Sequence, residues 1–359
     1  MKITDVKCYV VPTITEAPGF HWRQGLPVLA RPGLKTHQAV IRIETDTGLT
    51  GHASGGGYAI AEFIGHTLKQ ELIGENPLFT EHLWQRMWEW HRIGFPDTNL
   101  MDEALWDIKS QAAGLPLYVL LGGHNPRVPA YFSTVTYDTM EEYERYIKEA
   151  AQEGFFAFKL HASGDPKWDA KLARNLREWV GDDADLMFDA SGGWDYVTAL
   201  WFGRVLEEVN FLWYEEPMRE YDLPSYAELC RSLDIPILGA ETSEGAHWNM
   251  ATWIQQRALD MVRVSTNKGG YTGAMKVAHM AESFGMRAQV HGYNAHLCAA
   301  ISNNDYAEIF AINSEQIKGL KNKNGAGRVV NGYVTTSDRL GTGPHPDWQE
   351  VENRAVLIV

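Results

Sequence analysis

The hydrophobic and polar positions divide the chain into two parts. Residues 2–11 and 36–46 alternate between apolar and polar side chains and are rich in β-branched residues, a pattern that predicts strands of an antiparallel sheet. The stretch 13–35 between them is polar, contains Gly and Pro, and is long for a simple connection. Residues 58–121 then carry apolar side chains at helical spacing. We therefore predict an α+β domain over residues 1–125.

The pattern changes after this first part, where short apolar segments alternate with amphipathic helical segments. Eight segments are expected as strands: 130–136, 155–160, 185–190, 211–215, 236–240, 260–265, 287–291 and 305–310. Eight repeats of a strand followed by a helix predict a parallel α/β barrel over residues 126–320. The tail, residues 321–359, returns to β-like sequence and is expected to pack back on the first domain.

Composition and charge narrow the class of protein. Apolar residues make up 45% of the chain and charged residues 22%, as in ordinary globular proteins. The net charge of −14 disfavours nucleic acid or an anionic membrane as a partner, since both require basic surface. The N-terminus shows no signal-peptide pattern and no apolar run could span a bilayer, so we expect a cytoplasmic protein. Cys8, Cys230 and Cys298 are far apart and are expected to be buried thiols.

Three acidic residues stand directly after predicted strands of the barrel. Glu215 follows Asp189 by 26 residues, and Glu241 follows Glu215 by 26 residues. One strand–helix unit has about this length, and functional side chains of parallel barrels lie at the carboxyl ends of strands. Three unpaired carboxylates at one rim would repel one another, and a hard divalent cation removes that repulsion. Ligation by oxygen alone favours magnesium, with manganese as the alternative.

Basic groups are predicted on both flanks of this metal site. Lys159 and His161 end the second barrel strand, and His291 ends the seventh. Removing a proton next to a carboxylate needs a positioned base and strong stabilisation of the resulting enediolate. A metal ion that binds the substrate carboxylate supplies the stabilisation, Lys159 adds positive charge, and either histidine can serve as base.

Seven short motifs occur in an order and at spacings that identify a known family. They are ALWDIKSQAAGLPLYVLLGG, FKLH, MFDASGGW, WYEEP, LGAET, KGGYTG and VHG. With these motifs the chain resembles the enolase superfamily, and most closely its mandelate racemase subgroup. The resemblance implies a (β/α)7β TIM-like barrel with an α+β capping domain formed by the N-terminal region and the C-terminal tail. It also implies a homo-oligomer and Mg²⁺ bound by Asp189, Glu215 and Glu241; Glu216, the second acid of WYEEP, is not a ligand.

The resemblance also implies roles for the remaining site residues. Lys159 contacts the substrate carboxylate, His161 is the base on one face, and His291 is the base or acid on the opposite face. Glu308 on the eighth strand matches an acid that hydrogen-bonds a carboxylate oxygen.

Loops of the capping domain set specificity in this family. Here they correspond to the stretch around Phe20–Arg23 and to the loop 51–57. They offer four candidates to touch the distal end of a polyhydroxy acid: His21, Trp22, Arg23 and His52.

Two positions depart from the family pattern. The strand-two motif is Lys159-Leu160-His161, where relatives often have KxK. Ser265 stands where an Asp usually pairs with the strand-seven histidine, and Asp260 is expected to lie too far down the barrel to replace it. These departures indicate a distinct specificity group, with a lower pKa for His291 than in relatives.

The leading functional hypothesis is an acid-sugar dehydratase. A histidine removes the C2 proton of an aldonate or aldarate, an acid such as His291 helps the 3-hydroxyl leave, and the enol tautomerises to a 2-keto-3-deoxy acid. Epimerisation or racemisation of a 2-hydroxy acid and cycloisomerisation of a sugar lactone are the enzymatic alternatives. A catalytically silent, metal-stabilised binding protein is the alternative from another class.

Overall fold

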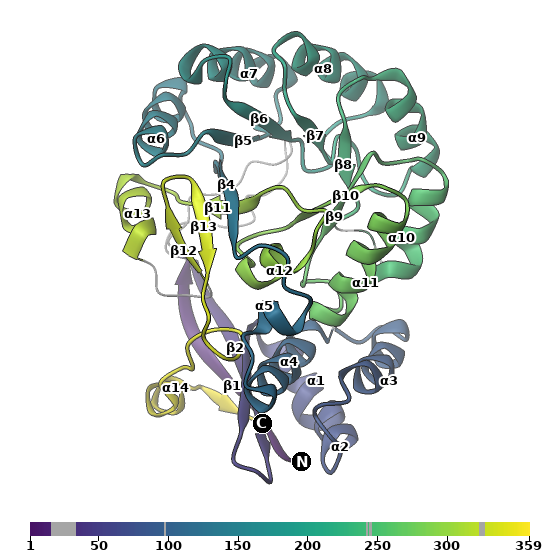
Figure 1. Ribbon diagram of the computed structural model, residues 1–359, viewed down its shortest axis with the longest axis vertical. Coiled ribbons are helices and arrows are strands. Elements are labelled where there is room, and N and C mark those ends of the chain that lie inside the picture. The colour runs from purple at the N-terminus through teal and green to yellow at the C-terminus, as the bar shows by residue number, and fades with distance from the viewer. Residues whose placement is uncertain (16–33, 97, 242, 244–245, 323–326) are drawn as a thin grey trace.

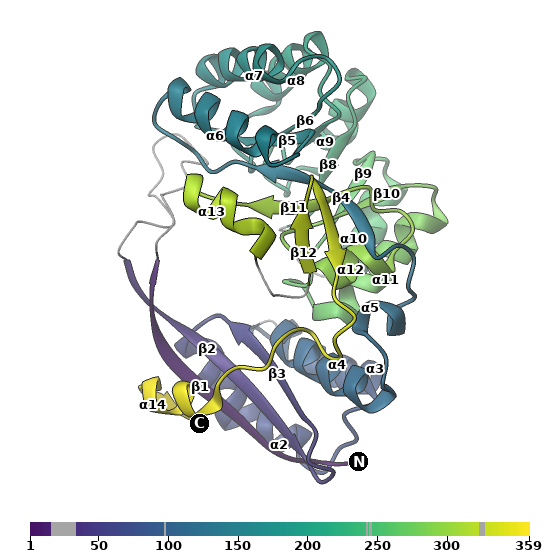
Figure 2. The same cartoon turned by 60° about the vertical axis from the view of Figure 1, so that its left-hand side comes forward.

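The computed structural model describes residues 1–15, 34–96, 98–241, 243, 246–322 and 327–359. A barrel stands above a smaller α+β domain, and both chain termini lie in the smaller domain (Figures 1 and 2). Among the described helices, none is both long enough and apolar enough to cross a membrane.

The capping domain is built on a four-stranded antiparallel sheet. Its strands lie in the order β14-β1-β2-β3, with bounds Leu357–Ile358, Ile3–Thr15, Leu34–Thr45 and Thr50–Gly55. The alternation seen in the sequence places Val6, Cys8 and Val10 of β1 in the core of this domain. The described residues of the domain also form these helical segments: α1 (Tyr58–Phe63), η1 (Ile64–Leu68), α2 (Lys69–Leu72), α3 (Thr80–Arg92), α4 (Asn99–Ala113) and α5 (Leu117–Leu120).

All eight predicted barrel strands are present and pair in parallel. They are β4 (Arg127–Ser133), β5 (Ala157–His161), β6 (Asp185–Asp189), β7 (Trp213–Glu215), β8 (Ile237–Gly239), β9 (Met261–Val264), β10 (Arg287–Val290) and β11 (Ala307–Phe310). Strands β4 to β10 pair in chain order, and β11 pairs with β4. The helices that follow the strands are α6 (Met140–Gln152), α7 (Pro166–Val180), α8 (Tyr196–Glu208), α9 (Leu223–Ser232), α10 (Ala246–Gln255), α11 (Gly270–Ser283), α12 (Ala295–Ala300) and α13 (Ser314–Gly319). The predicted barrel architecture is confirmed.

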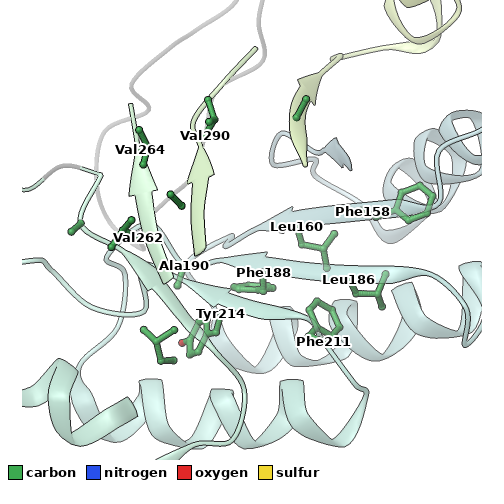
Figure 3. Packing of buried hydrophobic residues seen from close by; sticks show 14 of the residues in the cluster. Phe158, Leu160, Leu186, Phe188, Ala190, Phe211, Tyr214, Val262, Val264 and Val290 are labelled. Carbon is green, nitrogen blue, oxygen red and sulfur yellow. The ribbon is translucent and has the colours of Figure 1, made fainter. Parts of the chain in front are cut away.

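Strand alternation separates the apolar core from the barrel interior. On β5, Phe158 and Leu160 join the large cluster between strands and helices, as Leu186 and Phe188 do on β6 (Figure 3). Successive side chains of a strand point to opposite faces, so Lys159 takes the face opposite to Phe158 and Leu160. A ring of apolar side chains fills the interior below the site: Tyr131, Ala157, Met187, Trp213, Leu238, Met261 and Tyr306.

The C-terminal segment contacts both parts of the chain. After the 3₁₀ turn η2 (Leu320–Asn322), strands β12 (Gly327–Val330) and β13 (Tyr333–Thr336) form a hairpin. Strand β13 pairs antiparallel with the start of β4, so this hairpin extends the barrel sheet. The last part, with α14 (Trp348–Arg354) and β14, packs on β1 of the capping domain, and Gly341 and Thr342 before it hydrogen-bond to α4.

Stability should depend on pH through His296, which lies on α12 and is almost fully buried. Its ring stacks on Tyr118 of α5, and burial lowers its pKa to about 4. His296 takes up a proton near pH 6.5 in the unfolded chain but only near pH 4 in the folded chain. Its protonation therefore does not lower the free energy of unfolding above about pH 6.5, and lowers it progressively as the pH drops toward 4. At pH 4 the loss is on the order of 3 kcal/mol from this group.

Urea unfolding at pH 7.5, 6, 5 and 4 measures this slope. We expect His296→Gln to remove part of the slope between pH 6.5 and 4. A slope equal to that of the wild type would contradict the assignment of this proton to His296.

Candidate active site

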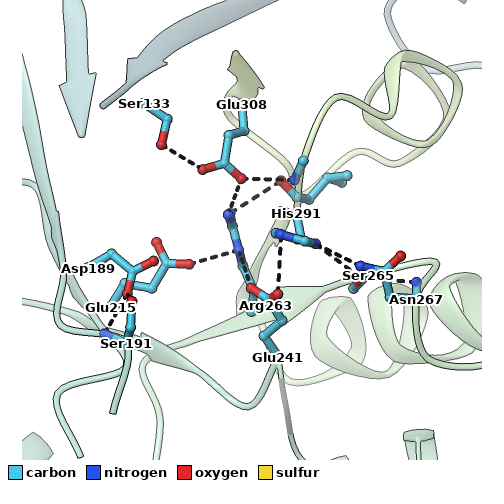
Figure 4. Close-up of polar contacts among 12 residues, drawn as sticks. Ser133, Asp189, Ser191, Glu215, Glu241, Arg263, Ser265, Asn267, His291 and Glu308 are labelled. Carbon is cyan, nitrogen blue, oxygen red and sulfur yellow. Dashed lines mark hydrogen bonds and ion pairs between the residues drawn. The ribbon is translucent and has the colours of Figure 1, made fainter. Parts of the chain in front are cut away.

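The strand ends bring the predicted residues to one rim of the barrel. The register of the sheet pairs His161 on β5 with Asp189 on β6, and Asp189 with Glu215 on β7. These three side chains therefore leave the sheet at the same height. Glu241 and His291 come shortly after β8 and β10, and Figure 4 shows them together with Asp189 and Glu215.

Lys159 lies inside the barrel and joins three carboxylates. Its Nζ is 2.8 Å from Glu308 Oε1, 2.9 Å from Glu215 Oε2 and 3.4 Å from Asp189 Oδ2. Burial alone would lower the pKa of Lys159, but Glu215 and Glu308 raise it well above its usual value. The residue is therefore a permanent positive charge at the floor of the site.

Arg263 on β9 is a site residue that the sequence analysis missed. Its guanidinium is buried at the centre of the site (Figure 4), where Nε lies 2.8 Å from Glu215 Oε1 and 3.5 Å from Glu241 Oε2. A terminal nitrogen of Arg263 pairs with Glu308, and the other donates to the Tyr131 hydroxyl. The alternation of β9 carried the signal, because Arg263 lies two residues after Met261 of the barrel interior.

His161 is held between two acceptor oxygens. Its Nδ1 lies 2.7 Å from the Thr134 carbonyl, and its Nε2 lies 3.3 Å from Asp189 Oδ2. A carbonyl and a carboxylate both accept hydrogen bonds, so each ring nitrogen of His161 faces an acceptor. Asp189 also accepts hydrogen bonds from the backbone N–H and hydroxyl of Ser191.

His291 has different surroundings. Its Nδ1 lies 3.3 Å from the Ser265 hydroxyl and its Nε2 lies 3.2 Å from Glu241 Oε1. Burial, followed by the charge of Arg263, lowers the pKa of His291 to about 4, so the ring is neutral near neutral pH. Asp260 accepts a hydrogen bond from Ile237 N at the start of β8, at the opposite end of the strands.

Glu308 is already saturated with hydrogen-bond donors. Its Oε1 accepts a hydrogen bond from the Ser133 hydroxyl and pairs with the Lys159 ammonium. Its Oε2 accepts hydrogen bonds from the backbone N–H of Gly292 and from Arg263. Burial favours the neutral acid, but Lys159 and Arg263 outweigh it and hold the pKa of Glu308 well below its usual range. An ionised carboxylate accepts and does not donate, so here Glu308 acts as a counter-charge.

The charge of the acidic set suits one hard divalent cation, but the oxygens of Asp189, Glu215 and Glu241 do not all lie within 4.8 Å of one another in this structure. Four carboxylates, from Asp189, Glu215, Glu241 and Glu308, face the two cations of Lys159 and Arg263, which leaves a formal charge of −2. Glu215 Oε1 is buried and has no hydrogen bond, because Arg263 Nε lies close to it without pointing at it. Burial raises the pKa values of Glu215 and Glu241. The positive charge of Arg263 acts in the opposite direction but does not outweigh burial. A divalent cation would neutralise the excess charge with oxygen ligands.

Glu216 is not part of this set of charges. It is buried with a positive φ of 41°, and burial raises its pKa well above the usual range. Within the described residues, the ion pairs of Lys159 and Arg263 go to Asp189, Glu215, Glu241 and Glu308 and not to Glu216.

A second cluster of potential metal ligands lies in the capping domain. Among the described residues, one group has its ligand atoms all within 4.8 Å of one another, namely His52, Asp107 and His345. Asp107 already accepts hydrogen bonds from the backbone N–H groups of His52 and Thr342 and from the side chain of Gln111. It therefore serves as a hydrogen-bonding centre that ties β3 and the C-terminal segment to α4.

A polar cavity of about 380 Å³ continues from His291 toward the capping domain. His52 and Glu103 line its capping side, and Asn267 and Asn294 line its barrel side. The structure thus places His52 in the wall of a cavity that also contains His291. The other predicted specificity residues, His21, Trp22 and Arg23, lie outside the described residues.

Comparison with known proteins identifies the family that the sequence motifs suggested. The family model for the mandelate racemase / muconate lactonizing enzyme N-terminal domain matches residues 26–122, and the model for the enolase C-terminal domain-like family matches residues 142–351. Arabinonate dehydratase of Saccharolobus solfataricus is 30% identical, over 88% of this chain and 90% of its own. A 3,6-anhydro-α-L-galactonate cycloisomerase of Streptomyces coelicolor is also 30% identical, over 92% of this chain and 97% of its own.

A solved structure matches the whole fold. D-glucarate dehydratase from Agrobacterium tumefaciens, complexed with magnesium, superimposes with a TM-score of 0.89 and 33% identity, over 99% of this chain and 100% of its own. The relatives are dehydratases, epimerases and cycloisomerases, so this chain is an enzyme of the lyase or isomerase class and not a silent binding protein. It belongs to the enolase superfamily, in the mandelate racemase subgroup.

Proposed function

We propose that this enzyme is a magnesium-dependent dehydratase that converts a sugar acid, an aldonate or an aldarate, into a 2-keto-3-deoxy acid. The observation that carries the proposal is the pair of histidines that flank the cluster of acidic residues. His161 lies beside Asp189, and His291 lies beside Glu241. Support comes from relatives named as sugar-acid dehydratases, among them arabinonate dehydratase and L-talarate/galactarate dehydratase.

The metal would be held by Asp189, Glu215 and Glu241. When bound, Mg²⁺ supplies Lewis-acid stabilisation of the negative charge that develops on the substrate carboxylate. Lys159 adds a fixed positive charge from below, and it stays charged because Glu215 and Glu308 surround it. The substrate carboxylate is thus expected to sit above Lys159.

The surroundings of the two histidines suggest how they divide the proton transfers. The neutral ring of His291 removes the proton from C2, and the electron pair of that C–H bond moves into the enediolate. His161, whose nitrogens face the Thr134 carbonyl and Asp189, donates a proton to the 3-hydroxyl. The C3–O bond then breaks, water leaves, and the enol tautomerises to the 2-keto acid. This proposal reverses the initial hypothesis, in which His291 was the candidate acid.

The distal end of the substrate would occupy the polar cavity between barrel and capping domain. Its walls offer an imidazole at His52 and amides at Asn267 and Asn294, groups that exchange hydrogen bonds with hydroxyls. Such a wall fits a chain of hydroxylated carbons better than an apolar tail. Assembly into a homo-oligomer stays a prediction.

A broad library of aldonates and aldarates tests the proposal. With Mg²⁺, we expect at least one member to yield a 2-keto acid, detected as its semicarbazone, and addition of EDTA should abolish the product. Absence of 2-keto acid from every member would overturn the dehydratase proposal.

Epimerisation is the second candidate, because His161 and His291 lie on opposite sides of the carboxylates. Proton NMR in deuterium oxide separates the two reactions. Exchange of the C2 proton with retention of the 3-hydroxyl in the product would favour an epimerase.

A further inference from the structure

Lys159, Glu215, Arg263 and Glu308 form a closed ring of alternating charges inside the barrel. Glu215 uses Oε2 for Lys159 and Oε1 for Arg263, at 2.9 and 2.8 Å. Glu308 repeats this arrangement, with Oε1 on Lys159 and Oε2 on Arg263. All four side chains are at most 1% exposed.

Because the ring is buried, its charges act strongly on the metal site. Solvent screens buried charges weakly, so each cation must be matched by nearby carboxylates and each carboxylate by a cation. Arg263 is the member of the ring that also reaches Glu241, at 3.5 Å. Its guanidinium reaches all three carboxylates at once, Glu215 and Glu241 by charge through Nε and Glu308 by a hydrogen bond from a terminal nitrogen, which the single ammonium of a lysine cannot do.

We propose that Arg263 is a positioning residue that sets the charge and geometry of the cation site. It holds Glu215, Glu241 and Glu308 in place, and it keeps the formal charge of the site at −2, which a divalent cation neutralises. The proposal rests on the proposed metal site of Asp189, Glu215 and Glu241.

Charge selectivity follows from this role. Without the positive charge of Arg263 the site would carry −3, and the attraction of a cation grows with its own charge. A trivalent ion should therefore gain more affinity than Mg²⁺. The ratio of the Tb³⁺ and Mg²⁺ dissociation constants reports this effect directly and needs no turnover.

The experiment measures Mg²⁺ binding by calorimetry and Tb³⁺ binding by luminescence on the full-length wild type and on two single variants. For Arg263→Gln we expect the preference for Tb³⁺ over Mg²⁺ to rise roughly tenfold or more. Arg263→Lys keeps the charge and loses the guanidinium. The preference of this variant for Tb³⁺ over Mg²⁺ should stay within about threefold of that of the wild type. Its kcat should fall by on the order of 10², because the carboxylates are no longer held in position.

A second pair of variants keeps the test decisive if Arg263→Gln does not fold. Glu308→Gln alone should lower the preference for Tb³⁺, because the formal charge becomes −1. The double variant Arg263→Gln/Glu308→Gln returns the charge to −2 and should return the preference toward that of the wild type.

The outcomes separate this inference from the proposed function. If the wild type binds both ions but the removal of Arg263, alone or in the Glu308→Gln background, leaves the ratio unchanged, the role of Arg263 is overturned and the metal site stands. If the wild type binds neither ion, the proposed metal site is itself overturned, and the role of Arg263 with it.

Discussion

Replacing Glu241 by Gln should lower kcat/KM by on the order of 10³ or more, because the change replaces a charged carboxylate ligand of the proposed metal site by a neutral amide. Glu241 is the informative position to change because its side chain is 21% exposed, whereas that of Glu215 is fully buried between Lys159 and Arg263. Loss of the Glu215 charge would leave a buried cation without its partner and would threaten folding. Gln at position 241 keeps the size of the side chain.

The affinity for Mg²⁺ should fall together with the activity. We expect a loss of at least about 100-fold in calorimetry, which exceeds the effect of removing an outer partner of a metal ligand. Glu228→Gln is the matched control, since this residue makes an exposed ion pair with Arg231 on α9 and should change neither quantity. Turnover by Glu241→Gln equal to that of the wild type would refute the metal assignment.

The barrel could be predicted from the sequence because its signals are local. Each strand is a short apolar run, and the 26-residue interval from Asp189 to Glu215 and on to Glu241 gives the period of the repeat. Strand register then fixes the height of the acids, since His161, Asp189 and Glu215 are paired across neighbouring strands. Repetition and alternation thus carry both the architecture and the position of the acidic rim.

The contacts across the barrel could not be predicted in the same way. Arg263 lies inside an apolar strand, and its partners Glu215 and Glu308 are 48 and 45 residues away in sequence. No local pattern states which carboxylates a buried arginine will meet. For the same reason the four donors that surround Glu308 could not be predicted from the sequence.

The C-terminal segment shows another limit of local patterns. Its β-like sequence predicted strands, and the structure contains them, but a strand pattern does not name the sheet that it joins. The hairpin of β12 and β13 extends the barrel at β4, whereas the last residues pair with β1.

Variants of the two histidines should lose different steps of the reaction. For the dehydratase we expect His291→Asn to lose both turnover and exchange of the substrate C2 proton with deuterium oxide, each by on the order of 10² to 10⁴, because it lacks the base. His161→Asn should lose turnover by a similar factor and retain C2 exchange, because the proton can still be removed while the 3-hydroxyl lacks its acid.

The physical basis for this asymmetry is the opposite surroundings of the two rings. Both ring nitrogens of His161 lie against acceptor oxygens, of Thr134 and Asp189, whereas burial and the charge of Arg263 keep His291 neutral. Proton NMR of the sugar acid found in the library measures exchange and turnover in the same sample. An epimerase would behave differently, because each histidine would serve as the base for one epimer and each variant would lose exchange of that epimer alone. Retention of C2 exchange by His291→Asn together with its loss in His161→Asn would reverse the roles of base and acid.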